Sequence, residues 1–202
     1  MKTSIAVVVI LVIIGAIWYS VGKSNYAQKA EVTPSPSVVV TPNGIGENIS
    51  GTYNIDTSKS VIKWTGSKHL LVDYFDNGTI KAKSGSIVIN KGMLEGGTII
   101  FDISSITTTS TGKKTGESTL TKHLKSADFF DAVKYPTAEY TIASTTVQSD
   151  GSIVLHGNLK AKDVTAPLSF LVHVALKDNN IIVIGKTDVD RTIWNIKYGS
   201  DK

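Results

Sequence analysis

The sequence predicts an all-β fold whose antiparallel strands close into a barrel or pack as a sandwich. Two observations lead to this prediction. Val, Ile and Thr supply 65 of the 202 residues, whereas Glu supplies five and Leu eleven, and β-branched residues favour strands over helices. Several segments also alternate between apolar and other residues with a period of two, which is typical of strands that bury one face.

The longest alternating segment covers residues 164–176. Its even-numbered positions are apolar from Val164 to Leu176, whereas the odd-numbered positions include Thr165, Ser169 and His173. Thirteen residues with this period predict a long strand with one buried face.

Turn residues separate the other predicted strands. Asp150-Gly151 lies between the strand-like residues 140–147 and 153–159. Asp178-Asn179-Asn180 lies between the long strand and residues 181–184. Such pairs are typical of hairpin connections, so we expect an antiparallel meander.

Residues 80–88 predict a strand with an irregularity. Ile80, Ala82 and Val88 are expected to share one face, opposite the lysines between them. Gly85 is the expected position of a kink or bulge, because glycine inside a strand often marks one.

One segment predicts a short helix. Within Glu117–Lys125, Leu120 and Leu124 are four residues apart, and Ser118 or Thr119 is the expected N-cap. The preceding residues 104–119 are rich in Ser, Thr, Gly and Lys, and we expect them to form a mobile loop.

Residues 1–22 predict a transmembrane anchor or a signal segment. Residues 3–22 carry no charge, and a twenty-residue helix spans about 30 Å, the hydrocarbon thickness of a bilayer. Trp18 and Tyr19 lie at one end, where aromatic rings prefer the headgroups. We therefore expect an N-terminal transmembrane helix that contacts the membrane through residues 4–21.

The alternative for this segment is a secretory signal that is removed, with Ser20 and Gly22 as a weak cleavage site. Both interpretations export the rest of the chain. We expect a single-pass protein of the cell membrane with its domain on the extracytoplasmic side, or a secreted or periplasmic protein after cleavage.

Residues 23–50 predict a linker and residues 51–202 the folded domain. Three of the five prolines, Pro34, Pro36 and Pro42, lie in the first segment among Ser, Thr, Val and Gly, a composition that forms no core. The chain has no cysteine, which excludes disulfides, thiolate metal sites and a cysteine nucleophile.

The chemistry-bearing residues give only weak signals. The four histidines show no metal-ligand spacing, and the +3 charge of residues 50–202 forms no basic stripe, so we expect no metal, no cofactor and no nucleic acid. His123 lies near Asp128 and Asp131, which leaves an acid–base pair open. Arg191 is expected to hold backbone carbonyls or carboxylates at a barrel end.

Four segments resemble the YceI-like family. They are Gly51-Thr-Tyr-Asn-Ile-Asp56 with Ser60-Val-Ile-Lys-Trp64, Leu120–Ala132 with Tyr135–Tyr140, Leu155–Pro167, and Asp190-Arg-Thr-Ile-Trp-Asn-Ile-Lys-Tyr-Gly-Ser200. They occur in the family's order over residues 51–200, and together they are specific.

The resemblance implies an exported, antiparallel lipocalin-like β-barrel whose apolar cavity holds a polyisoprenoid chain. We place six residues along that cavity: Trp64, Tyr140, Leu168, Phe170, Val172 and Val174. By the family motifs, four more residues would lie at the cavity mouth: His123, Phe129, Phe130 and Arg191.

The chain departs from the family pattern at two places. Asp76-Asn-Gly-Thr-Ile80 replaces the common H-x-G-T-I, so a polar role for that histidine is absent. Related domains also continue for some twenty residues beyond the Tyr-Gly-Ser and add a last strand. We therefore expect either that the sequence is a fragment or that the barrel lacks its last strand. In the second case we expect another segment to cover the open edge, since an unpaired edge would invite aggregation or pairing in a dimer.

The functional hypothesis is a membrane-tethered, non-catalytic module that holds a polyisoprenoid or similar amphiphile. Two alternatives stay open. One is an enzyme that acts on such a lipid through His123 with Asp128 or Asp131. The other is a structural or stress-related surface module whose barrel is filled by its own side chains.

Overall fold

The computed structural model describes residues 6–15, 44–67, 74–113 and 116–199. These residues form nine strands, one α-helix and one short 3-10 helix. The elements are β1 (Ala6–Gly15), β2 (Gly51–Asn54), β3 (Val61–Ser67), β4 (Phe75–Asn90), β5 (Met93–Ser110), α1 (Glu117–Lys125), β6 (Thr137–Val147), β7 (Ile153–Ala161), β8 (Val164–Lys177), β9 (Asn180–Asp188) and η1 (Arg191–Trp194).

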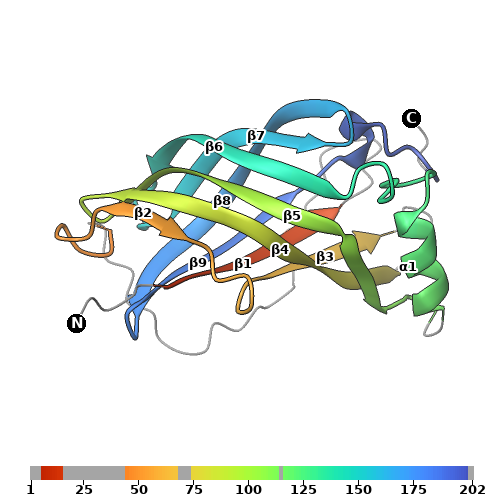
Figure 1. The fold of residues 1–202 in the computed structure, drawn as a ribbon, viewed down its shortest axis with the longest axis horizontal. Helices are drawn as coiled ribbons and strands as arrows, with labels where there is room; N and C mark the ends of the chain where they lie inside the picture. The colour runs from red at the N-terminus through yellow and green to blue at the C-terminus, as the bar shows by residue number, and fades with distance from the viewer. Residues whose placement is uncertain (1–5, 16–43, 68–73, 114–115, 200–202) are drawn as a thin grey trace.

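The sheet closes on itself as a barrel. Its strand order is β2-β4-β3-β1-β9-β8-β7-β6-β5, and β5 pairs back onto β4. Both β2 and β3 pair with the same side of β4, so β2 continues the line of β3. Figure 1 shows α1 and η1 at one end of the barrel, with the hairpin between β8 and β9 at the other. The predicted all-β antiparallel fold with one short helix is confirmed.

Strand β1 closes the barrel and makes the two parallel pairings of the sheet. It pairs in parallel with β3 on one side and with β9 on the other, whereas all seven other pairings between strands are antiparallel. Consequently β3 and β9 run in the same direction, and β1 lies between them. The edge that we expected to need a cover is covered by the N-terminal segment.

The predicted N-terminal transmembrane helix is therefore wrong for Ala6–Gly15, which are a strand. Seven of these ten residues are Val or Ile, whose branched side chains fit a sheet better than a helix. Val7 and Val9 are fully buried in the barrel core. Among the described residues, no helix has the length and apolar character needed to cross a membrane. The flanking residues of the expected anchor, including Trp18 and Tyr19, lie outside the described residues, as does most of the linker.

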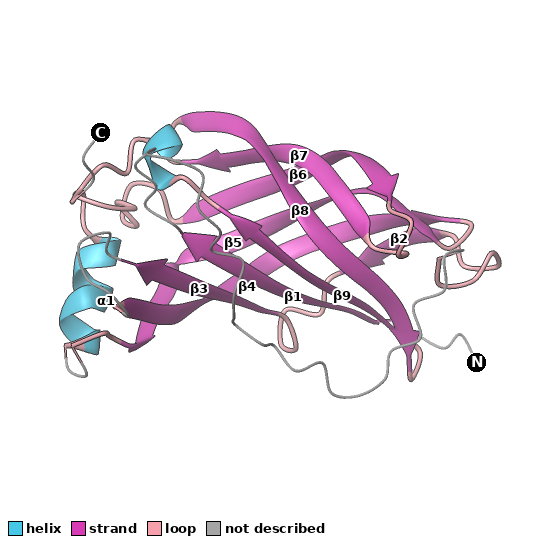
Figure 2. Ribbon diagram, turned by 180° about the vertical axis from the view of Figure 1, so that it is seen from behind, coloured by secondary structure: helices cyan, strands magenta, loops and turns pink. Residues whose placement is uncertain are grey.

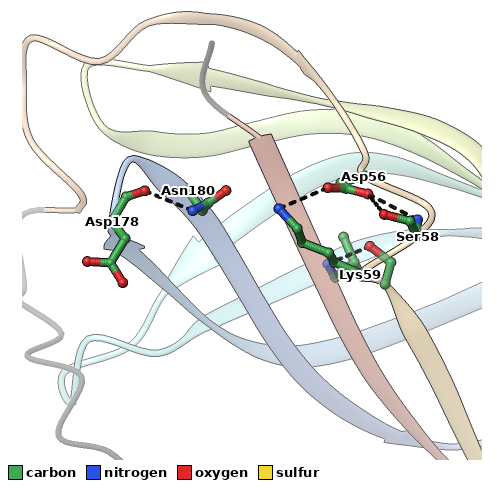
Figure 3. A network of polar contacts seen from close by, with 7 residues as sticks. Asp56, Ser58, Lys59, Asp178 and Asn180 are labelled. Carbon is green, nitrogen blue, oxygen red and sulfur yellow. Dashed lines mark hydrogen bonds and ion pairs between the residues drawn. The ribbon is translucent and has the colours of Figure 1, made fainter. Parts of the chain in front are cut away.

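A turn before β3 fixes the start of β1 (Figure 3). The amide of Asp56 donates to Val7 O at 2.7 Å, and the amide of Val9 donates to the buried Ser60 Oγ at 2.9 Å. The Asp56 carboxylate in turn accepts hydrogen bonds from Ser58 and pairs with Lys59 Nζ at 3.3 Å. The turn thus gives the backbone of β1 two hydrogen bonds in addition to those of its pairings with β3 and β9.

Local sequence signals place most other elements correctly. Strand β8 matches the predicted residues 164–176, and α1 has the predicted bounds. The hairpins lie where expected, with Gly151, Asp178 and Asn179 at positive φ. The described N-cap of α1 is Gly116, which makes no side-chain cap bond, so the predicted Ser118 or Thr119 cap is wrong.

Two further predictions on β4 and β5 are corrected. The expected mobile loop 104–119 is partly strand, because β5 continues to Ser110 along β4. Val88 is exposed, whereas Ile87 and Ile89 are buried. Between Ala82 and Ser84 the register with β5 shifts by one residue. After such a bulge the odd-numbered residues of β4 point inward instead of the even-numbered ones, which explains why Val88 is exposed.

Candidate functional site

The predicted cavity residues all belong to the inner wall of the barrel. Tyr140, Phe170, Val172 and Val174 are buried, and Leu168 is partly buried against the same core. Alternate positions of a strand face opposite sides of a sheet, and the residues between them, such as Leu171, are exposed. Leu176, also expected on the inner face, is exposed near the end of the strand. The site that strand parity predicts is thus one continuous apolar wall, built by β6, β7 and β8.

Tyr140 gives this wall one polar atom. Its hydroxyl donates toward Leu168 O at 3.0 Å and lies 3.3 Å from Leu155 O. Its ring packs edge-on against Phe170, with centroids 4.8 Å apart, and crosses Gly157, where a Cβ would lie 2.8 Å from the hydroxyl. Burial raises the pKa of Tyr140 well above its ordinary value, so the hydroxyl stays protonated.

Trp64 lies on the opposite part of the wall, on β3. Its register partner on β4 is Gly78, and the Gly78 partner on β5 is Thr108. A Cβ at position 78 would collide with Cε2 and Cζ2 of Trp64, so the indole lies directly over the glycine. Both Trp64 Nε1 and Thr108 Oγ1 are buried and have no hydrogen-bond partner in the part of the chain that the structure describes. The Trp64 indole N–H and the Thr108 hydroxyl therefore both lie on the inner side of the barrel. Their residues pair with Gly78 from either side, and we call this row across β3, β4 and β5 a rung.

Sequence reasoning missed Thr108 and Asp76 as interior residues. Asp76 is buried two residues before Gly78 on the same face of β4, and its Oδ1 accepts from Gly112 N at 3.2 Å. Thr108 was hidden inside the expected loop. The residue types of Ile106-Thr-Thr-Thr109 do not alternate, so the usable signal was only the preference of Ile and Thr for strands.

The two helices α1 and η1, which carry His123 and Arg191, lie at the same end of the barrel (Figure 2). His123 packs edge-on against Phe129 and Tyr198, with ring centroids 4.9 and 4.3 Å away. Phe130 is partly buried against the core beside this group. The guanidinium of Arg191 lies over Phe129, 5.3 Å from its centroid. We call His123, Phe129, Arg191 and Tyr198 the aromatic cluster.

Arg191 acts as the expected backbone clamp. One of its nitrogens donates to Ile196 O, and the other donates to Tyr198 O at 2.7 Å. Burial lowers the pKa of Arg191 from its usual value, with the Asp190 charge acting in the opposite direction. Asp190 accepts from the amide and hydroxyl of Thr192, which caps η1. These contacts hold the C-terminal residues over Phe129.

His123 also pairs with one of the two predicted carboxylates. Its Nε2 lies 3.4 Å from Asp128 Oδ2, whereas no contact joins it to Asp131 among the described residues. The Asp128 side chain is 63% exposed, so water surrounds most of this pair. The contact fixes the turn after α1, and an acid–base role would have to operate in a solvated position.

The other histidines are on the outside of the barrel or outside the described residues. His156 and His173 are exposed, as their strand positions predict, and His156 bonds to Thr146 and Ser169 hydroxyls. His69 lies outside the described residues. The described part of the chain contains no group of three or more His, Asp or Glu side chains placed to hold a metal ion.

Comparison with solved structures finds proteins of similar type at low identity. A mutant CJ YCEI protein crystallised with a monobromobimane guest is 23% identical, with a TM-score of 0.40, over 54% of this chain and 60% of the other. The Burkholderia cenocepacia protein BcnA is 16% identical, with a TM-score of 0.38, over 48% of this chain and 65% of the other.

Comparison with curated proteins gives shorter but more similar matches. The protein YceI of Escherichia coli O157:H7 is 38% identical over 66 residues, which is 32% of this chain and 34% of the relative. A UPF0312 protein of Shewanella baltica is 36% identical over 52 residues, which is 26% of this chain and 27% of the relative. The matched part spans only about a third or a quarter of these relatives. The YceI-like domain itself matches residues 53–202, about three quarters of the chain, and the protein therefore belongs to the YceI-like family.

Proposed function

We propose that the protein is a non-catalytic lipid-binding module whose barrel holds a polyisoprenoid or a similar long-chain amphiphile. The observation that carries the proposal is the apolar inner wall, in which Leu168, Phe170, Val172 and Val174 follow one another along β8. Each buried CH₂ group of a ligand contributes about 0.8 kcal/mol, so such a wall can bind a long hydrocarbon without charged groups. Membership of the YceI-like family supports the same ligand class.

The test compares lipid retention in two tryptophan variants of β8. Leu168→Trp places extra volume on the inner face, whereas Leu171→Trp adds the same ring on the exposed outer face. Native mass spectrometry and lipid extraction of the full chain should find a polyprenyl species in the wild type and in Leu171→Trp. Leu168→Trp should retain at least about tenfold less. A wild type with no bound amphiphile, or equal retention in both variants, would contradict the proposal.

The His123–Asp128 contact favours a second candidate, an enzyme that acts on the bound lipid. The two hypotheses differ in whether the lipid changes. Lipid recovered after prolonged incubation should be chemically unchanged in the wild type if the protein is a binding module. Turnover that His123→Ala abolishes, with binding retained, would favour the enzyme instead.

We also propose an extracytoplasmic location close to a membrane, as the apolar N-terminal residues suggest. The position of β1 makes this proposal specific, because residues 6–15 cannot pair with β3 and β9 and also lie in a bilayer. Signal cleavage after residue 20 or 22 would remove β1 altogether. Cell fractionation with N-terminal sequencing of the mature protein distinguishes these states. An uncleaved protein found only in the cytoplasm would contradict the location.

A dimer through an edge strand stays a prediction. With β1 in place, β2 is the described strand that pairs through a ladder on one side only, onto β4. An isolated bridge between Val7 and Ile55 follows it. We expect any such dimer to form through β2, which sedimentation of the wild type and of a Thr52→Pro variant would test.

A further inference from the structure

A polar site lies inside the barrel wall, near its α1 end. On the rung formed by β3, β4 and β5, the indole of Trp64 crosses Gly78 toward the strand that carries Thr108. Thr108 is 9% exposed, and α1 covers its strand, since Thr108 N donates to Thr121 Oγ1 at 2.8 Å. The site is therefore enclosed by three strands and a helix.

The Trp64 and Thr108 side chains of this rung each carry a polar atom that has no partner among the described residues. Trp64 Nε1 and Thr108 Oγ1 are buried without a hydrogen bond. An unpaired buried polar group costs stability, and native proteins satisfy nearly all such groups. Other buried aromatic donors do have partners: the Tyr140 hydroxyl donates to Leu168 O, and the Trp194 indole N–H donates to Leu159 O. The unpaired pair therefore indicates partners supplied by a ligand.

The donor set and the local charge restrict the chemistry of that ligand. An indole N–H can only donate, whereas a threonine hydroxyl can donate or accept, so an oxygen of a ligand is a suitable partner for either group. Asp76 lies two residues along β4 on the same inward face. The lysines of these strands, Lys63 and Lys81, are exposed, and so is Lys113, which follows the Gly112 that bonds Asp76. Among the described residues none of them pairs with Asp76, and a carboxylate that pairs with no cation disfavours an anionic headgroup in a buried position.

From this juxtaposition we infer that Trp64 and Thr108 form a headgroup site for an uncharged, oxygen-bearing end of the amphiphile, a hydroxyl or a carbonyl. The inference rests on the proposed function and narrows it, because it excludes a diphosphate headgroup from this end of the barrel. The apolar wall of β8 then receives the hydrocarbon chain, and the site near α1 sets which end of the ligand enters first.

The test uses three probes with one hydrocarbon chain: farnesol, farnesene and farnesyl diphosphate. Titration of the full-length protein should show farnesol bound about tenfold more tightly than farnesene, the contribution of one or two net hydrogen bonds. Thr108→Val and Trp64→Phe should each reduce this preference to about twofold or less, because farnesol affinity should fall by more than any change in farnesene affinity. Thr107→Val is the matched control, since Thr107 is the exposed neighbour with a hydroxyl partner on Thr79.

Asp76→Asn probes the charge separately. It should strengthen binding of farnesyl diphosphate about tenfold or more while changing farnesol affinity little. Circular dichroism of each variant checks folding. Because Thr108→Val and Trp64→Phe test the site independently, the experiment is still decisive if one of them does not fold.

Each outcome separates the inference from the proposed function. If the wild type binds neither farnesol nor farnesene, the proposed function fails, and this inference fails with it. If it binds both equally, or if the preference survives in Thr108→Val and Trp64→Phe, the lipid-binding function stands and the headgroup site is overturned. Tight binding of farnesyl diphosphate to the wild type would overturn the uncharged class.

Discussion

The indole of Trp64 lies across the backbone of Gly78, its register partner on the adjacent strand. No other residue at position 78 would leave room for this arrangement, because a Cβ there would meet both the indole and Thr107 O. The glycine thereby leaves room for an aromatic ring over the backbone of β4, on the rung that also contains Thr108.

Gly78→Ala is expected to destabilise the barrel. The added methyl group must displace the ring or the β5 backbone, and overpacking of this kind costs about 1–3 kcal/mol. Gly96→Ala is the control, since its Cβ would meet only Val88 at 3.9 Å and the change stiffens the unfolded chain. Urea unfolding should show a clearly lower free energy of unfolding for Gly78→Ala and at most a small change in this free energy for Gly96→Ala. Equal midpoints would contradict the described packing.

Thr108→Val is expected to raise the free energy of unfolding of lipid-free protein by about 1 kcal/mol. The substitution keeps the side-chain shape and removes a buried hydroxyl that has no partner. In Thr107→Val the lost hydroxyl does have a partner, Thr79 Oγ1 at 3.0 Å, so no gain is expected there. A destabilised Thr108→Val would mean that its hydroxyl is already satisfied inside the protein.

Val7→Asp tests whether the N-terminal segment closes the barrel. A carboxylate at this fully buried position loses its hydration, and an unpaired buried charge costs about 3–5 kcal/mol. Val133→Asp, at a position that is 96% exposed, should change stability by no more than about 0.5 kcal/mol. Hydrogen exchange should also show faster exchange of β3 and β9 amides in Val7→Asp. If both variants behave alike, β1 is not part of the folded barrel.

Tyr140→Phe is expected to remove one source of alkaline instability. Burial raises the pKa of Tyr140 above its ordinary value of 10.0, so the unfolded chain loses this proton at lower pH than the folded protein does. The resulting contribution to stability is complete below pH 10.0 and is lost as the pH rises from there toward the folded-state pKa.

The measurement is the difference in unfolding free energy between wild type and Tyr140→Phe at several pH values. At pH 7 the variant should be about 1 kcal/mol less stable, because it lacks the bond to Leu168 O. Above pH 10 this difference should shrink. A difference that is independent of pH would show that Tyr140 ionises equally in both states.

The local pattern of the sequence determined most of the strands and the helix. The period-two alternation of residues 164–176 identified β8 and its buried face, and the Asp-Gly and Asp-Asn-Asn turns identified two hairpins. It also placed Tyr140, Phe170, Val172 and Val174 on one inner wall. These features follow from contacts between neighbours in the chain, so a single sequence contains them.

The tertiary structure alone decided two features. A run of Val, Ile and Leu is apolar enough for a membrane helix as well as for a buried strand, and the position between the parallel-running β3 and β9 selects the strand for residues 6–15. Likewise, Trp64 and Thr108 are 44 positions apart, and they share a rung because the registers of two strand pairs with bulges align them through Gly78. Register between distant strands depends on the sum of many side-chain contacts across the sheet, and no local pattern of residues records that sum.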